Sequence, residues 1–234
     1  MKRRGQPWND DGELFAVTRA ELYTAVVGDI MDRLGRQRQF LPPQIRPLRP
    51  DMIVAGRAMT VVHSDFIADE TSASANPAIS KPFGLMLDAL DGLRPNEVYI
   101  CSGASPCYAL WGELMSTRAI KCGAVGAVLN GYTRDTIGIS ALSFPTFSLG
   151  PYAQDAAIRG KVVDYRVPIE IGGVRVNPGD IVFGDIDGVC VVPKEIETEV
   201  FTKALQKARE EKSVKNAISG GMTAKAAFTK WGIL

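Results

Sequence analysis

The sequence predicts an α/β fold in which a layered sheet is covered by helices. Helix-like and strand-like segments alternate up to residue 135, and residues 160–193 are rich in strands and glycine turns. A long amphipathic helix and a shorter one follow. Since 234 residues can bury a substantial core, we expect one α/β domain. Its β-rich second half favours a layered sheet over a doubly wound one.

The N-terminal part is predicted to begin with a polar segment and a helix. Residues 1–17 form the polar segment, and we expect the first twelve of them to be loose. Thr18 and Glu21 have the spacing of a capping box, so residues 18–35 are predicted to form one helix. Four prolines make residues 39–52 an extended connection, because proline lacks a backbone donor.

The next two segments are predicted to be a strand region and a second helix. Residues 53–66 alternate well enough for one or two strands. Residues 80–93 are predicted to be helical, with Phe83, Leu87 and Leu90 on one apolar side.

A strand–helix–strand crossover is predicted in the middle of the chain. Residues 94–103 read as a turn followed by a buried strand, and residues 112–121 read as a helix. Gly123 interrupts this helix, and residues 124–130 form a short strand. Such a crossover is parallel and right-handed, so the loops after both strands open on the same sheet edge, where ligands usually bind.

The C-terminal part is predicted to be helical. Residues 194–219 have the pattern of a long amphipathic helix, and residues 222–234 that of a short one. We therefore divide the chain into the polar N-terminal segment, a domain of residues 18–193 and a helical extension of residues 194–234. This extension is expected to pack on the domain or on a neighbouring subunit.

Composition and charge exclude several classes of protein. The net charge is +1 and no basic run exceeds KRR near the N-terminus, so nucleic acid is not an expected partner. No segment approaches the ~20 apolar residues that span a bilayer, so no membrane is expected either. The polar N-terminus and four cysteines without a CxxC spacing favour a cytoplasmic protein with free thiols over disulfides.

The chain contains a single histidine, which excludes multi-histidine metal sites. His63 lies in an alternating, strand-like run, so an ordinary packed histidine is the favoured interpretation. Any acid–base chemistry would therefore depend on carboxylates, lysines, tyrosines or bound water.

The start of the helix at 112–121 is a candidate anion site. The first backbone N–H groups of a helix, here those of Glu113, Leu114 and Met115, have no partner within the helix and attract negative charge. Gly112 lets a ligand approach this backbone closely.

The loop after the second crossover strand adds a charged pair. Arg134 offers a planar fork suited to a carboxylate or keto oxygen, and Asp135 offers a hard oxygen suited to Mg²⁺. Glu113 is expected to face the same edge and to hold a metal-bound water. The alternative, a capped helix next to a solvated Arg–Asp turn, stays open on these residues alone.

The two halves of this site resemble a paired motif of the RraA-like family. The motif reads GELM at residues 112–115 and GYTRD at residues 131–135, and the segments IRPL, GRAMTV, NPGDIVFGDIDGVCVVP and AREEK also look like that family. The family includes the 4-hydroxy-4-methyl-2-oxoglutarate/4-carboxy-4-hydroxy-2-oxoadipate aldolases, which were once misassigned as dimethylmenaquinone methyltransferases. A methyltransferase is not expected, because no glycine-rich loop follows a first strand.

The resemblance implies a swivelling β/β/α-type domain that assembles as a homotrimer or a dimer of trimers (a hexamer). It also implies a divalent cation, Mg²⁺ or another such as Mn²⁺. By the match, Asp135 is the metal ligand, Arg134 contacts the keto or enolate oxygen, and the amides around Leu114 and Met115 hold the substrate carboxylate.

Other acids have less certain counterparts in the family. Glu113 stands where the family often has aspartate, which keeps the charge but lengthens the reach. The family also uses an acid from the neighbouring subunit. The candidates here are Asp29, Glu210 and Glu211, whose alternative interpretation is exposed helix charge.

The implied activity is metal-dependent cleavage of a 4-hydroxy-2-oxo acid to pyruvate and a carbonyl compound, with oxaloacetate decarboxylation as a side activity. Two alternatives remain. A Schiff-base aldolase would need a buried lysine, for which Lys81 and Lys121 are the candidates. A non-catalytic member of the family would instead bind and regulate a ribonuclease.

Overall fold

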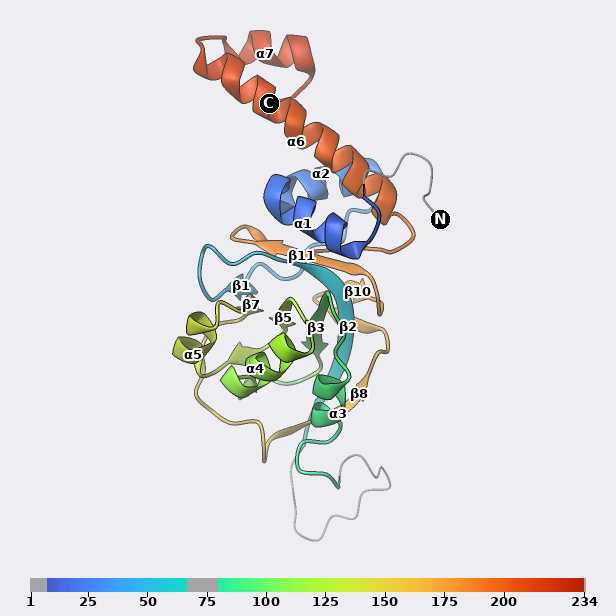
Figure 1. Cartoon of the computed structure of the whole chain (residues 1–234), viewed down its shortest axis with the longest axis vertical. Coiled ribbons are helices and arrows are strands. Elements are labelled where there is room, and N and C mark those ends of the chain that lie inside the picture. Colours follow the sequence, from blue (N-terminus) through green and yellow to red (C-terminus); the bar gives the residue numbers. More distant parts are fainter. Residues whose placement is uncertain (1–7, 67–79, 234) are drawn as a thin grey trace.

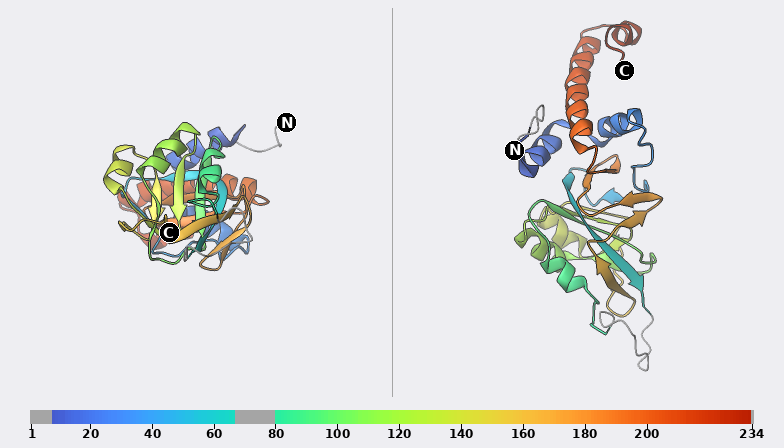
Figure 2. Two further views of the ribbon diagram at one scale, coloured as in Figure 1. Left: turned by 90° about the horizontal axis from the view of Figure 1, so that it is seen from below. Right: turned by 90° about the vertical axis from the view of Figure 1, so that its right-hand side faces the viewer.

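A computed structural model describes residues 8–66 and 80–233 of the chain. The main sheet has the order β1-β7-β5-β3-β2-β11-β12, with β8 also paired to β2, and it curves into a nearly closed barrel (Figures 1 and 2). Its strands are β1 (Arg46–Pro47), β2 (Val54–Asp65), β3 (Glu97–Ser102), β5 (Gly126–Leu129), β7 (Thr146–Ser148), β8 (Gly160–Tyr165), β11 (Ile181–Asp185) and β12 (Gly188–Val192). The barrel is the frame on which the candidate site is built.

The long strand β2 organises the sheet. One of its edges pairs in parallel with β3, and β5 continues the parallel part on the far side of β3. The other edge pairs antiparallel with β11 near its start and with β8 near its end. The predicted strand region at 53–66 and the predicted parallel crossover are both confirmed.

The two faces of the sheet bury separate hydrophobic clusters. In β3 every residue is buried, and Tyr99 and Cys101 face one cluster while Val98 and Ile100 face the other. Side chains alternate between the faces of a strand, so a strand buried on both faces supplies both cores.

Helices cover one face of the sheet and a hairpin covers the other. The helices are α3 (Met86–Asp91), α4 (Glu113–Lys121) and α5 (Thr136–Ala141), and the hairpin strands are β9 (Ile169–Ile171) and β10 (Val174–Val176). This arrangement is the β/β/α layering expected from the sequence.

A third cluster joins three of the remaining helices, α1 (Asp11–Glu21), α2 (Thr24–Arg33) and α6 (Glu197–Ser219), to the end of the sheet. The last helix, α7 (Ala224–Trp231), packs on α6. In Figure 1, α6 extends away from the barrel and α7 folds back beside it. The two predicted C-terminal helices are confirmed, whereas the division of the chain into three segments stays a prediction.

The helix predicted at 18–35 is wrong, because this stretch holds parts of two helices. α1 already begins at Asp11, and its N-cap Asp10 accepts from the Glu13 N–H at 2.9 Å. The backbone is extended between α1 and α2, where the Thr24 N–H and hydroxyl both donate to buried Asp185 at 2.7 Å. This long-range contact fixes the break.

The N-terminal residues that the structure describes are not loose, contrary to the sequence prediction. Trp8 is only 4% exposed and packs edge-on against Phe201 of α6. Leu14 and Phe15 are fully buried. Residues 1–7, to which the prediction also applied, lie outside the described range.

The second predicted helix is shorter than expected, and its apolar side differs. Gly84 has a positive φ of 63° and forms an isolated bridge to Val162 of β8, and the Leu85 N–H donates to the Val162 carbonyl at 2.9 Å, so residues 84 and 85 are tied to the sheet. Only Met86–Asp91 is helical. Leu90 is buried as predicted, but Leu87 is 55% exposed.

The cysteine and membrane predictions can also be compared with the structure. All four cysteines are free, and Cys101 and Cys190 are buried. Within residues 8–66 and 80–233, no helix has the length and apolarity needed to cross a membrane.

His63 is packed in the sheet, as predicted. It is 4% exposed, and its Nε2 lies 3.4 Å from the Tyr99 hydroxyl. Burial lowers its pKa to about 4, from an ordinary value of 6.5. Because the folded-state pKa lies below the unfolded-state pKa, only the unfolded chain takes up a proton between these two values.

The free energy of unfolding is expected to decrease as the pH falls from about 6.5 to about 4, with a contribution from His63 of about 3 kcal/mol. His63→Gln removes the titrating group and should make the stability less dependent on pH in this window. Urea unfolding of both proteins across the window measures the difference. Identical pH dependence would contradict the assignment.

Candidate active site

A pair of short strands joins the two halves of the predicted site. β4 (Ala109–Trp111) precedes α4, and β6 (Tyr132–Thr133) precedes α5, and the two strands pair in parallel. The Arg134 N–H donates to the Trp111 carbonyl at 2.9 Å. Backbone hydrogen bonding therefore holds Gly112 next to Arg134.

A buried aromatic residue fixes the start of α4. The Trp111 indole N–H donates to the Ser116 hydroxyl at 2.7 Å, and its ring stacks on Phe144 with centroids 6.0 Å apart. The Ser116 N–H closes the first helical turn on the Gly112 carbonyl at 3.1 Å. The N–H groups before Ser116 thus precede the hydrogen bonds of the helix itself.

Asp135 lies directly against this helix start. One of its carboxylate oxygens, Oδ2, is 3.4 Å from the Glu113 N–H. A Cβ atom on Gly112 would lie 2.6 Å from the same oxygen, so a larger residue would displace the carboxylate from this position. The predicted close approach at Gly112 is therefore made by Asp135.

The backbone of Asp135 is in the left-handed region, with φ 56° and ψ 35°. Asp135 occupies the N-cap position of α5, where aspartate commonly caps its own helix, yet its side chain makes no capping bond. The carboxylate is directed toward α4 instead. An unusual backbone conformation that aims a charged group at a helix start is typical of a functional position.

Arg134 lies between two carboxylates. Its Nη1 is 3.0 Å from Asp155 Oδ1, and its Nε is 3.6 Å from Asp135 Oδ2. All three side chains are partly exposed, so a ligand can still reach them. Asp155 orients the guanidinium without removing it from the solvent.

These groups line a cavity of 290 Å³ between α3 and the start of α4. The predicted site residues found in its wall are Gly112, Leu114, Met115, Arg134 and Asp135. Glu113 is not in the wall, because its carboxylate lies against Gly138 of α5. The water-holding role of Glu113 stays a prediction.

Asp135 fits a site for Mg²⁺ in which only one or two ligands come from the protein. Among the described residues, no group of three or more His, Cys, Asp or Glu side chains could hold a metal ion. Mg²⁺ commonly binds through one or two carboxylates and keeps several waters. The half-exposed Asp135 carboxylate matches that pattern, with open space beside it for water and substrate.

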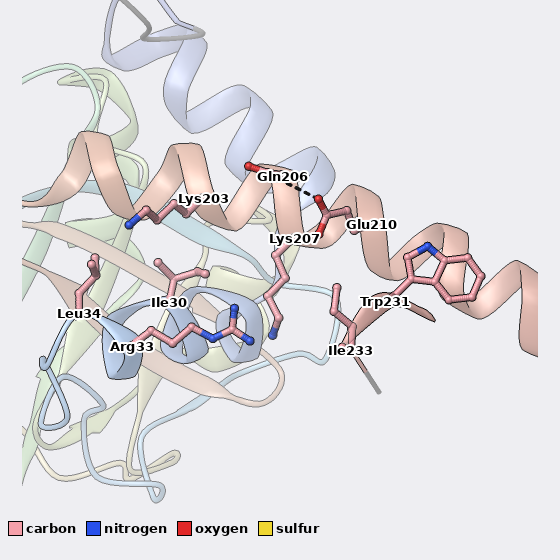
Figure 3. Close-up of a pocket in the computed structure, with 10 residues that line it drawn as sticks. Ile30, Arg33, Leu34, Lys203, Gln206, Lys207, Glu210, Trp231 and Ile233 are labelled. Carbon is pink, nitrogen blue, oxygen red and sulfur yellow. Dashed lines mark hydrogen bonds between the residues drawn. The ribbon is translucent and has the colours of Figure 1, made fainter. Parts of the chain in front are cut away.

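The predicted partner-subunit acids lie elsewhere, around Lys207 of α6. Asp29 forms an ion pair with Lys207, and Glu211 lies 3.1 Å from the same amine. Glu210 accepts from Gln206 at 2.8 Å at the edge of a second cavity (Figure 3). Within one chain the structure does not bring these acids to Asp135, and their action across an interface stays a prediction.

The two lysines considered for a Schiff base are both exposed. Lys81 pairs with Asp88 at 2.9 Å, and Lys121 lies in the last turn of α4. Neither lines the cavity next to Arg134. A buried lysine does exist at Lys207, but its amine is already paired with two carboxylates.

Sequence reasoning missed Asp155 and Lys207. Asp155 lies in the loop between β7 and β8, with no regular spacing to Arg134, so only the fold brings the two together. Lys207 could have been found from its helix, because Lys207 and Glu211 have the four-residue spacing of a helical ion pair.

Gly112→Ala is expected to lower the pyruvate-releasing activity that the family resemblance implies by about 100-fold. A displacement of a catalytic group by about 1 Å can have an effect of that size. The added methyl group would push the Asp135 carboxylate away from α4. Stability should fall by no more than about 1 kcal/mol. Activity and thermal unfolding are measured together, with Gly220→Ala, whose added atom meets only ordinary contacts at 3.4 Å, as the matched control.

Comparisons with known proteins identify the family of the chain. The family model described as Aldolase/RraA matches residues 24–191, which include both halves of the site. A Halalkalibacterium halodurans protein named "Putative 4-hydroxy-4-methyl-2-oxoglutarate aldolase" is 31% identical over 88% of this chain and 89% of its own length.

Two further relatives extend the comparison. DlpA of Legionella pneumophila is 29% identical over 87% of this chain, which spans only 31% of DlpA. The crystal structure of Streptomyces coelicolor RraAS2, "an unusual member of the RNase ES inhibitor RraA protein family", superposes with a TM-score of 0.76 at 23% identity. The aligned region covers 89% of this chain and 100% of RraAS2, and it shows a shared fold. The family-model match over residues 24–191, more than half of the chain, shows that the chain belongs to the RraA-like family.

Proposed function

We propose that the chain is a divalent-metal-dependent lyase that cleaves a 4-hydroxy-2-oxo acid to pyruvate and a second carbonyl compound. Decarboxylation of oxaloacetate is proposed as a side activity. The observation that supports this most is the meeting of the α4 N-terminus, Arg134 and Asp135 in one cavity. This set offers a site for a carboxylate, a donor for a keto oxygen and a ligand for a cation.

The substrate carboxylate is proposed to lie at the start of α4. The amides of Leu114 and Met115 precede the hydrogen bonds of the helix, and the helix dipole also favours an anion there. Arg134 then donates to the C2 oxygen from its position beside Asp135. Asp135 would hold Mg²⁺ or Mn²⁺, which when bound supplies a Lewis acid for the charge that develops on this oxygen.

The reaction begins with loss of the C4 hydroxyl proton to a base. The C3–C4 bond breaks, C4 becomes a carbonyl, and the electron pair of the bond moves through C3 onto the C2 oxygen as a pyruvate enolate. Arg134 stabilises this oxygen, and protonation of C3 completes pyruvate. Donors aimed at developing charge commonly supply the largest catalytic contribution.

The base is proposed to be a carboxylate acting through water. Glu113 is the candidate within the chain, because it starts α4 next to the cavity. Asp29, Glu210 and Glu211 are the candidates from a neighbouring subunit of a trimer or a dimer of trimers. A cytoplasmic location is proposed from the four free cysteines.

The test is pyruvate release from 4-hydroxy-4-methyl-2-oxoglutarate and from oxaloacetate, coupled to lactate dehydrogenase. Release is expected with Mg²⁺ or Mn²⁺ and should be lost after treatment with EDTA. Undiminished release in EDTA would contradict the role of the metal. No release with either cation, from these two compounds or from a 4-hydroxy-2-oxo monocarboxylic acid, would favour the alternative, a ribonuclease-binding regulator, which a pull-down with the ribonuclease would then examine.

A further inference from the structure

The charged side chains of the cavity are all at one end. Arg134, Asp135 and Asp155 are the charged residues in its wall, and Arg134 is the only cation among the described residues that line it. Arg134 is next to the α4 N-terminus and contacts both carboxylates. In the proposed reaction, this end is occupied by the 2-oxo acid moiety of the substrate.

The rest of the cavity lining is mainly apolar. An apolar wall is formed by the segment that leads into α3, by α3 itself and by the first turn of α4, with the side chains Phe83, Met86, Leu87, Leu90, Leu114 and Met115. Leu87 is 55% exposed and Leu114 is 83% exposed. Large apolar side chains left in solvent around a cavity commonly mark a surface that a ligand covers.

Two basic residues close to this wall in the sequence are engaged elsewhere. Lys81 is paired with Asp88 at 2.9 Å, and Arg118 with Asp91 at 2.7 Å, and neither lines the cavity. Residues 67–79, which lie outside the described range, contain no lysine or arginine. Among the described residues of one chain, a second carboxylate on the substrate would thus meet an apolar wall without a cation, which is costly for a charged group.

We infer that the preferred substrates are 4-hydroxy-2-oxo acids with an apolar group on C4, rather than dicarboxylic acids. This inference rests on the proposed function and adds the chemical class of the group beyond the broken bond. The C4 substituent lies on the wall formed by α3 and α4, where alkyl contact is favourable. Each buried methylene changes specificity by about tenfold or more.

The experiment uses two substrates of similar shape and different charge. 4-Hydroxy-5-methyl-2-oxohexanoate carries an isopropyl group on C4, whereas 4-hydroxy-2-oxoglutarate carries a carboxylate there. The ratio of their kcat/KM values for pyruvate release, with Mg²⁺ present, is measured for the wild type and for Leu87→Arg. Comparing ratios between proteins cancels the intrinsic difference in reactivity of the two compounds.

Leu87→Arg places a cation on the apolar wall and should shift the ratio toward the dicarboxylate by at least about tenfold. Ile186→Arg is the control, because Ile186 is also about half exposed but lies in the turn between β11 and β12. This variant should keep the wild-type ratio.

The possible outcomes separate the inference from the proposed function. A wild type that favours the dicarboxylate, or a Leu87→Arg ratio equal to that of Ile186→Arg, would overturn the inference, while pyruvate release itself would sustain the proposed function. No pyruvate from either compound with Mg²⁺ or Mn²⁺ would overturn both.

Discussion

Asp135→Asn is expected to lower kcat for metal-dependent pyruvate release by about 100-fold or more. The amide keeps the shape of the side chain but removes the charge that would hold a divalent cation. The change also takes away one of the two carboxylates beside Arg134. The cation concentration needed for half-maximal activity should rise along with the fall in kcat.

The measurement is a titration of Mg²⁺ at saturating substrate for the wild type and Asp135→Asn. Asp51→Asn is the matched control, since Asp51 is exposed and pairs only with Arg49 in the described residues, far along the chain from the site. Equal half-maximal Mg²⁺ and equal kcat in wild type and Asp135→Asn would exclude Asp135 as the metal ligand. Thermal unfolding of each variant shows whether the fold is intact.

Arg134→Lys is expected to lower kcat by about 100-fold, a size comparable with the loss of one oxyanion donor. Lysine keeps the positive charge but lacks the planar fork that reaches Asp135 and Asp155 at the same time. A donor that is no longer fixed in position stabilises the enolate oxygen less. The loss should therefore appear mainly in kcat.

Single-turnover and steady-state rates of pyruvate release for Arg134→Lys separate the chemical step from product release. The control is Arg118→Lys. Arg118 is an exposed arginine of α4 that pairs with Asp91. A fully active Arg134→Lys enzyme would mean that a positive charge suffices without the fork. Such a result would contradict the proposal that the fixed, planar guanidinium of Arg134 is needed to stabilise the enolate oxygen.

Much of the fold could be predicted because local patterns and the final structure agree. The apolar run of β3 is buried on both faces, and α4 ends where Gly123 adopts a positive φ of 81°. The halves of the site also came together as expected, since a parallel crossover puts Gly112 and Arg134 on one edge.

Other features depend on contacts between distant residues and leave little trace in local sequence. The break between α1 and α2 is held by Thr24 and Asp185, which are 161 positions apart. Thr18 matches a capping pattern, yet it is buried inside α1 because a better cap exists at Asp10. The contact of Asp155 with Arg134 likewise arises only when the loop after β7 folds over the site.

The pairing of β4 with β6 has a consequence for how this protein could change its substrates. Main-chain hydrogen bonds, which do not depend on side-chain identity, keep the start of α4 in register with Arg134. The part of the apolar wall on α3 belongs to a different segment. Its exposed side chain, Leu87, is not packed in the hydrophobic core. In the proposed mechanism, Arg134 and the start of α4 take part in bond breaking, whereas the part of the apolar wall on α3 acts only in substrate choice. Substitutions on one short helix could diversify the substrates while the inherited reaction stays intact.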